Sequence, residues 1–224
     1  MLLFDLLLPR ICPVCGRVLL RGEKYLCLKC ISDLPLTYFW SWPENPAEGR
    51  FIERVNIVRA SSLFFYRDES PYKNIIHLFK YKGSRGLGAY MGCMLGEKLL
   101  ESGAYNDIDI ILPVPLHPLK RWKRGYNQAS IIARSVGEVL RKPVIEGSLV
   151  RARYTMSQTK KDALQREKNV SGAFKIRKEF LLKGRHILLI DDVLTTGATL
   201  GACAAAVLEL DGCSVSVATL AFAE

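Results

Sequence analysis

Two adjacent carboxylates followed by hydroxyls and one glycine form the part of the sequence best suited to chemistry. Asp191 and Asp192 follow the apolar run 187–190 and precede the threonine- and glycine-containing segment 195–199. An apolar run with charge only at its end is typical of a strand buried on both faces in a parallel sheet. Open α/β sheets bind ligands at the carboxyl ends of their strands, so we expect a ligand here.

The segment after the acids is predicted to be a helix N-terminus. One face of the helix would carry the apolar residues Leu200, Cys203, Ala204, Val207 and Leu208. Residues 195–199 would then offer unpaired amides and hydroxyls to an anion, and Gly197 would let the backbone approach a phosphate. Bare carboxylates would repel that anion. The pattern therefore favours a ligand that also presents hydroxyls or a divalent cation, such as a ribose 5-phosphate with Mg²⁺.

The sequence ILLIDDVLTTGAT at 187–199 resembles the phosphoribosyl pyrophosphate (PRPP) motif of type I phosphoribosyltransferases. By this resemblance, Asp191 and Asp192 meet the ribose hydroxyls. The PRPP-binding residues are then Val193, Leu194, Thr195, Thr196, Gly197, Ala198 and Thr199, of which 194–199 wrap the 5-phosphate. A plain alternative is a buried strand that ends in an Asp-Asp turn. A Walker B strand is unlikely, because no G-x-x-x-x-G-K-[ST] motif occurs in the chain.

A second chemical pattern lies near the N-terminus, where two CxxC pairs supply Cys12, Cys15, Cys27 and Cys30. This spacing predicts a zinc ribbon with four thiolate ligands and a structural metal, since no coordination position stays open for catalysis. Zinc binding can contribute on the order of 10 kcal/mol to the folding of so short a segment. Two disulfides or redox motifs are the alternative, which the lack of an export signal disfavours.

A rigid loop and a charged segment could complete a pyrophosphate site. Strand 108–112 is followed by the pyrophosphate-loop candidates Pro113, Val114, Pro115, Arg121 and Arg124. Residues 151–170 form a long charged stretch predicted to be a lid, with a disordered surface excursion as the alternative. Its donors are Gln158, Lys160, Lys161 and Asn169, and Arg166 joins the two aspartates as a candidate catalytic residue.

The remaining pattern predicts an α/β fold with two domains. Residues 1–50 would hold the ribbon and an aromatic linker, and residues 51–224 a parallel sheet flanked by helices. We expect strands over 55–66, 108–112, 144–150, 173–176, 187–190 and 213–222, and helices over 71–83, 89–101, 127–140 and from residue 200 onward. The aromatics of 35–49 could stack on nucleic-acid bases, although such clusters more often pack one module onto another.

Composition and charge limit the functional classes. With 49% hydrophobic and 24% charged residues, the chain is predicted to be globular, and no apolar run approaches the roughly 20 residues of a membrane span. We expect a cytoplasmic protein whose first ten residues form a docking helix. The net charge of +10 is concentrated in residues 117–185, with 18 Lys and Arg against 5 Asp and Glu. Such a region suits phosphates on a small ligand or a nucleic acid, although solvated helix faces could also explain part of it.

Taken together, four features resemble the ComF family of competence-related phosphoribosyltransferase-like proteins. They are the cysteine ribbon, PVPLHPLKRWKRGYNQA from residue 113, Gln158 with REKNVSGAF downstream, and IDDVLTTGAT from residue 190. Tyr126 replaces a common phenylalanine, and Lys168 adds a cation to an R-x-x-N spacing. The resemblance covers nearly the whole chain and implies a role in natural transformation, handling single-stranded DNA beside a DNA translocase.

Two functional hypotheses follow. The first is an enzyme that transfers a phosphoribosyl group from PRPP with Mg²⁺, releasing pyrophosphate, for example in nucleotide metabolism or salvage. No stretch identifies its acceptor. The second is a binding module in which the same fold grips single-stranded DNA and a partner protein. The two are compatible, because a nucleotide site could regulate a DNA adaptor.

Overall fold

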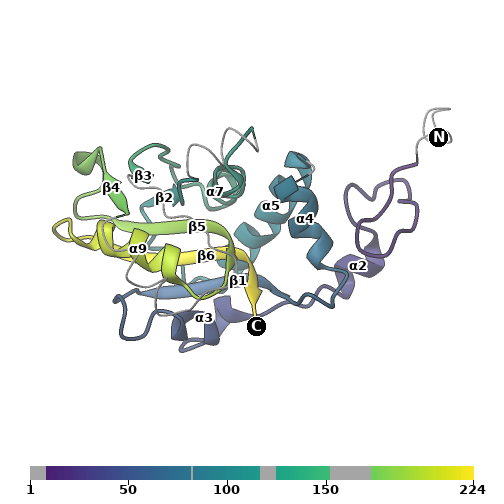
Figure 1. Ribbon diagram of the computed structural model, residues 1–224, viewed down its shortest axis with the longest axis horizontal. Helices are drawn as coiled ribbons and strands as arrows, with labels where there is room; N and C mark the ends of the chain where they lie inside the picture. Colours follow the sequence, from purple (N-terminus) through teal and green to yellow (C-terminus); the bar gives the residue numbers. More distant parts are fainter. Residues whose placement is uncertain (1–8, 82, 117–124, 152–172) are drawn as a thin grey trace.

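A parallel four-stranded sheet forms the centre of the molecule (Figure 1). The computed structural model describes residues 9–81, 83–116, 125–151 and 173–224. The strand order is β1-β6-β5-β2, with β1 at Arg59–Tyr66, β2 at Ile110–Pro113, β5 at His186–Leu194 and β6 at Ser214–Ala223. The predicted α/β class with a parallel sheet is confirmed.

Helices cover both faces of this sheet, and the alternation of β5 shows why. Leu188 and Ile190 belong to the core on the side of α4, α5 and α7, whereas Ile187 and Leu189 belong to the core beneath α9. These helices are α4 Lys73–Tyr81, α5 Arg85–Ser102, α7 Gln128–Leu140 and α9 Ala198–Leu208. A strand that is apolar on both faces must be buried on both, as the run 187–190 predicted.

Helices α5 and α7 pack closely because small residues line their contact. A Cβ atom on Gly92 would lie 2.9 Å from the Cβ of Ser135, and one on Gly96 would lie 2.9 Å from the Cβ of Val139. Such distances leave no room for a side chain. Helix α5 was predicted to begin at residue 89, but it starts at Arg85, because Gly86 and Gly88 are also contact residues, against Tyr25 and Phe79.

Three predicted strands differ clearly from the observed ones, and the first, expected over 55–66, begins only at Arg59. The expected strand 187–190 continues through both acids to Leu194, because β6 pairs with it as far as the partners Leu194 and Phe222. The expected strand 144–150 does not form as a unit. Val144 makes an isolated bridge to Ile111, and the chain then forms the antiparallel pair β3 Leu149–Arg151 and β4 Phe174–Ile176. Short 3-10 turns occupy η1 Phe39–Ser41 and η2 Glu179–Leu181.

The cysteine ribbon packs against α4 at one end of the molecule (Figure 1). It contains the short helix α2 Leu28–Ser32. Tyr72 donates its hydroxyl to the carbonyl of Cys30 at 3.1 Å, and the Asn74 amide donates to the carbonyl of Pro13 at 3.0 Å. The division at residue 50 stays a prediction, and the expected docking helix of the first residues lies outside the described part of the chain.

Between the ribbon and the sheet, the aromatic segment packs with two of its four aromatic side chains and exposes the other two. Phe39 and Trp40 are buried, whereas Tyr38 and Trp42 are exposed. The segment ends in α3, Pro46–Gly49, which Asn45 caps by accepting from the amides of the first turn. Nowhere in the described chain does a helix combine the length and the hydropathy needed to cross a membrane.

Candidate functional site

Four cysteine side chains converge in the ribbon. The Sγ atoms of Cys12, Cys15, Cys27 and Cys30 lie within 4.8 Å of one another, and those of Cys15 and Cys27 are 3.7 Å apart. Tetrahedral zinc with Zn–S bonds of about 2.3 Å requires S···S separations of about 3.8 Å. All four residues are free thiols rather than disulfides. The cluster therefore fits a tetrathiolate metal such as zinc.

Local turns place these thiols and tune them unequally. Cys12 lies in a turn closed by its carbonyl and the amide of Gly16, and Cys27 caps α2 by accepting from the amide of Cys30 at 3.4 Å. Burial opposes the charged form of Cys12, but hydrogen bonds from the backbone of Cys27, Cys15 and Val14 bring its pKa down to about 7. Burial and the neighbouring thiols raise the pKa of Cys30. The charged form is thus favoured at Cys12 and disfavoured at Cys30. A bound divalent cation would stabilise both thiolates.

Glu23 supports the ribbon and was missed by the sequence analysis. Its carboxylate accepts hydrogen bonds from the amides of Leu20 at 2.6 Å and Leu28 at 2.8 Å, and from Arg17 at 2.6 Å. These backbone hydrogen bonds and the guanidinium lower the pKa of Glu23. It ties the two halves of the ribbon together, but its spacing from the cysteines matches no motif.

At the carboxyl end of β5, the two predicted acids point to opposite faces of the sheet. The Asp192 carboxylate pairs with Nζ of Lys80 on α4 at 2.9 Å, and both side chains are largely buried, with exposed fractions of 13% and 22%. Asp191 lies on the α9 side, where burial first, and then Asp191, raise the pKa of the Cys203 thiol. The Asp191 carboxylate also accepts from the amide of Asp192 at 2.9 Å.

The predicted phosphate loop lies at the start of α9, as expected. Gly197 caps this helix with a left-handed φ of 77°, and its carbonyl accepts from the amide of Gly201 at 2.7 Å. The hydroxyl of Thr196 accepts from the amide of Ala198 at 3.4 Å. The first amides of a helix have no partner within the helix, so this loop can present donors to an anion.

The predicted pyrophosphate loop follows the neighbouring strand. Pro113 is in register with Ile190, and the amide of Val114 donates to the carbonyl of Ile190 at 2.9 Å. The side-chain amide of Asn127 donates to the carbonyl of Val114 at 3.0 Å and so fixes the start of α7 beside the loop. The backbone at 113–114 is therefore held next to the two acids.

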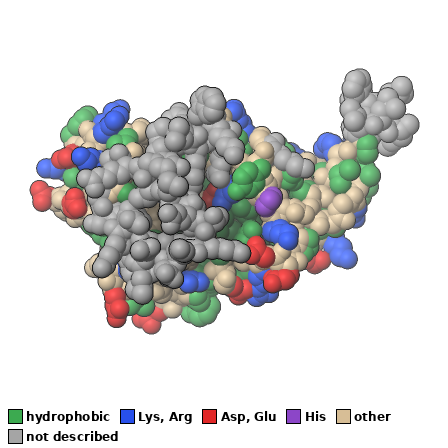
Figure 2. Space-filling model, viewed as in Figure 1, with side chains coloured by type: hydrophobic (Ala, Val, Ile, Leu, Met, Phe, Trp, Pro, Cys, Tyr) green, Lys and Arg blue, Asp and Glu red, His purple; other side chains and the backbone are tan. Residues whose placement is uncertain are grey.

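Seven predicted site residues lie outside the described part of the chain. They are Arg121 and Arg124 of the pyrophosphate loop, and Gln158, Lys160, Lys161, Arg166 and Asn169 of the lid segment. Nine of the 18 cations of residues 117–185 also fall there. On the face in Figure 2, the described cations and anions are interspersed.

Three side chains at this site were not predicted: Lys80, Asn127 and Arg54, whose guanidinium donates to the carbonyl of Thr196. Lys80 and Arg54 reach the site from elements distant in sequence from the residues they contact, whereas Asn127 lies 13 residues after Val114. A lysine on an amphipathic helix is usually a solvated charge, so no pattern in the sequence singled out Lys80.

The chain is similar in sequence to several known proteins. A family model for the phosphoribosyl transferase domain matches residues 122–224, which include β5, the phosphate loop and β6. The DNA utilization protein YhgH of Escherichia coli (strain K12) is 28% identical over 211 residues, covering 92% of this chain and 88% of the relative.

Two relatives are named for competence. Competence protein F of Haemophilus influenzae is 26% identical over 196 residues, covering 84% of this chain and 75% of the relative. Competence protein ComFC of Bacillus subtilis is 27% identical over 200 residues, covering 89% and 72%. These similarities extend well beyond the segment that the domain model matches.

Proposed function

We propose, on the premise that this chain is a competence-related protein of the ComF type with a phosphoribosyltransferase fold, that it binds PRPP with Mg²⁺ and acts in handling single-stranded DNA. One observation carries the PRPP part. Asp191, the N-terminus of α9 and the backbone of Val114 lie at the carboxyl ends of two paired strands, and Asp192 lies beside them on the opposite face of β5. This is where open parallel sheets bind ligands.

Each part of the site suits one part of PRPP. The carboxylates of Asp191 and Asp192 would accept hydrogen bonds from the ribose hydroxyls, and the amides and hydroxyls of 194–199 would bind the 5-phosphate. Val193 of β5 would be the remaining PRPP-binding residue. The backbone after Pro113 and Val114 would face the pyrophosphate, with Pro115, Arg121 and Arg124 as its further residues.

Magnesium fits the donor set, because Mg²⁺ is commonly held by one or two carboxylates together with substrate phosphates. Asp191 and Asp192 are the carboxylates available for it here, and the ion would neutralise charge on the pyrophosphate. Lys80 already neutralises charge on the Asp192 carboxylate. The bound ligand would be covered by the lid residues Arg166, Gln158, Lys160, Lys161 and Asn169.

A calorimetric titration of Mg·PRPP tests the site. We expect micromolar binding to the native chain and at least a tenfold loss in Asp191→Asn/Asp192→Asn, because the amides donate where the ribose needs acceptors. Asp211→Asn is the matched control, since that carboxylate is 96% exposed and lies away from the site. Native protein that does not bind, or a double variant that binds equally, would reject the PRPP site.

The fate of bound PRPP separates an enzyme from a binding module. Pyrophosphate release with a panel of acceptors would indicate a phosphoribosyltransferase of nucleotide metabolism or salvage. Binding without release would indicate a regulatory site. The names of the relatives favour a DNA function, whereas the acid pair and phosphate loop suit either one.

The single-stranded DNA part has its own test. In this proposal, residues 1–50 form a zinc-bearing module and residues 51–224 the ligand domain, and the basic region 117–185 contacts DNA phosphates beside a DNA translocase. Binding to an oligonucleotide should weaken with salt, with a log-log slope of about −0.7 for each neutralised phosphate. A binding constant that does not change with salt would reject the phosphate contacts.

A further inference from the structure

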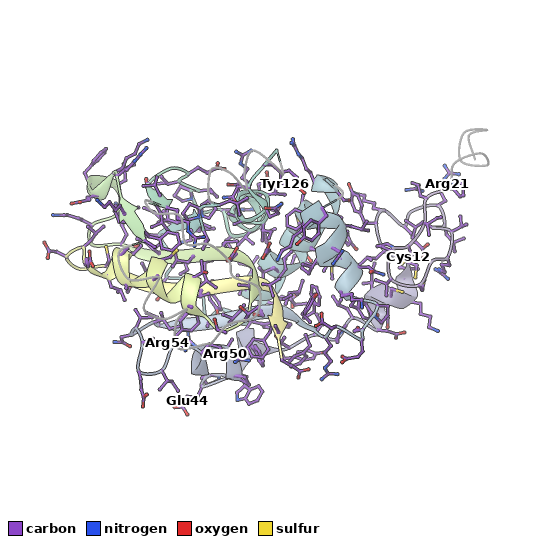
Figure 3. All side chains as sticks on the ribbon, in the orientation of Figure 1. Cys12, Arg21, Glu44, Arg50, Arg54 and Tyr126 are labelled. Carbon is purple, nitrogen blue, oxygen red and sulfur yellow. The ribbon has the colours of Figure 1, made fainter. Side chains whose placement is uncertain are left out.

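The phosphate loop is held from outside by a turn that precedes the sheet. Residues 50–54 follow α3, and Figure 3 labels Arg50 and Arg54 at its two ends. A Cβ atom on Gly197 would lie 3.1 Å from both the carbonyl oxygen and the Cβ of Arg50. The guanidinium of Arg54 donates to the carbonyl of Thr196. This turn thus touches two consecutive residues of the loop.

The contact to Thr196 determines where the next amide points. A peptide bond is planar and trans, so the C=O of Thr196 and the N–H of Gly197 point in opposite directions. When Arg54 draws the carbonyl toward the outside of the loop, the amide of Gly197 turns toward the inside. That inner side is where an anion at the N-terminus of α9 would sit.

We propose that Arg54 is a positioning residue, which orients the peptide between Thr196 and Gly197 so that its amide can bind the 5-phosphate. The inference rests on the proposed PRPP site and adds to it a residue from outside the motif. Arg54 acts through the backbone and does not touch the ligand.

The turn is anchored well enough for this role. Arg50 donates to the carbonyl of Ala223 at 3.1 Å, and its guanidinium lies 5.1 Å from the ring centroid of Phe222, so β6 holds it. Asn45 donates to the carbonyl of Ala60 at 3.0 Å, which ties the start of α3 to β1. Glu53, directly before Arg54, has a left-handed φ of 63°, a conformation that costs energy in a residue with a side chain. Contacts to β1 and β6 therefore fix the turn at residues 50–54, against which the loop at 195–199 packs.

A competing explanation is that Arg54 attracts the phosphate by its charge alone. The two explanations differ in what a side chain that replaces Arg54 must provide. Positioning needs only a donor that reaches the carbonyl, whereas attraction needs a positive charge. Glutamine supplies a donor without charge, and methionine supplies neither.

The experiment measures the dissociation constant of ribose 5-phosphate for the full-length native chain and three variants. We expect Arg54→Met to weaken binding about five- to tenfold, because the loop loses a charge-assisted hydrogen bond at an exposed position. Arg54→Gln should recover most of that loss and stay within about threefold of the native value. Arg21→Met removes a cation from the ribbon, far from the loop (Figure 3), and should change nothing.

The outcomes separate this inference from the proposed function. If the native chain binds neither ribose 5-phosphate nor Mg·PRPP, the PRPP site itself fails; if it binds only Mg·PRPP, the same variants are compared with that ligand. If it binds and Arg54→Met binds equally well, or if Arg54→Gln is as weak as Arg54→Met, positioning by Arg54 is rejected. Thermal unfolding of each variant shows whether the protein is folded. Should Arg54→Met not fold, Arg54→Gln is compared with the native chain, since attraction by charge predicts a loss of about fivefold or more and positioning predicts a loss within about threefold.

Discussion

The ribbon and the strand-end site are built in opposite ways. All four thiols of the ribbon come from residues 12–30, and short turns bring each pair together. The strand-end site gathers Arg54, Lys80, Val114 and Asp191 from elements spread across most of the chain. The first is encoded by local spacing and the second by the order of strands in the sheet.

This difference teaches where each site is vulnerable. A metal cluster depends on each of its ligands, so the loss of one thiolate removes most of the stabilisation that the metal supplies. A site assembled by the sheet is held by many moderate contacts, and the sheet survives the loss of any one of them. We therefore expect single substitutions to have large effects in the ribbon and graded effects at the strand end.

The largest effect should follow the loss of a thiolate. In Cys27→Ser, bound zinc should fall from one equivalent to a small fraction, because serine is a poor zinc ligand. Amide exchange should rise throughout residues 12–34 and stay slow in β5 and β6. Cys93→Ser is the control, since Cys93 lies in α5, outside the cluster.

Metal analysis and hydrogen exchange of the two variants check this. The comparison would break if zinc stayed bound to Cys27→Ser, or if the ribbon stayed ordered without metal. In that case packing on α4, rather than the metal, would hold residues 12–34.

A smaller but still clear effect is expected at Gly197. Alanine there would adopt a left-handed φ of 77° and place its Cβ 3.1 Å from the carbonyl oxygen of Arg50. We expect a loss of about 1–3 kcal/mol in the free energy of unfolding and at least a tenfold loss in PRPP affinity. Urea unfolding and calorimetry measure the two quantities.

Gly184→Ala separates strain from the close contact. Gly184 also has a positive φ, 67°, but a Cβ there would meet no atom within 4 Å. This variant should lose stability without losing PRPP affinity. If Gly197→Ala behaved in the same way, the loop would not depend on its close approach to the turn at Arg50.

The sequence predicted the four-cysteine cluster of the ribbon and the core of the fold for the same physical reason. Cysteine spacing determines how two turns can present four thiols, and an apolar run such as 187–190 can be satisfied only by burial on both faces. The place of residues 195–199 at the start of α9 was predictable as well, because these residues are contiguous in the sequence, whereas their binding of a phosphate stays a prediction. In each case, the residues that form the structural feature lie close together in the sequence.

The rest depended on tertiary contacts that no local pattern contains. Lys80 became part of the site because α4 packs beside the end of β5, and Arg54 because the turn after α3 returns to the start of α9. The end of β5 was predicted too early, since pairing with β6 carries the strand past two acids that would normally end it. Strand 144–150 was predicted from apolar residues, yet only Val144 bridges to β2 before the chain turns away.

A moderate effect is expected from the ion pair between Lys80 and Asp192. A double-mutant cycle with Lys80→Met and Asp192→Asn should give a coupling energy of about 1–2 kcal/mol, because the pair is largely buried. The exposed pair of Lys98 and Glu101, at 2.8 Å, should give at most about 0.5 kcal/mol in the matching cycle. Equal coupling in both cycles would mean that α4 does not hold the acid in place.

The smallest effect concerns the one element that both sites share. Helix α4 contacts the ribbon through Asn74 and through Tyr72 directly before the helix, and it reaches Asp192 through Lys80, so a path exists by which the loss of zinc would weaken PRPP binding. The helix is also fixed by Ile75 and Phe79, which are buried in a hydrophobic cluster that contains Leu188 and Ile190 of β5 as well as residues of the ribbon. We therefore expect chelated protein to bind Mg·PRPP within about threefold of the zinc-loaded form, measured after the chelator has been removed. A tenfold loss would show instead that the ribbon sets the position of α4, and that the locally encoded site controls the one assembled by the sheet.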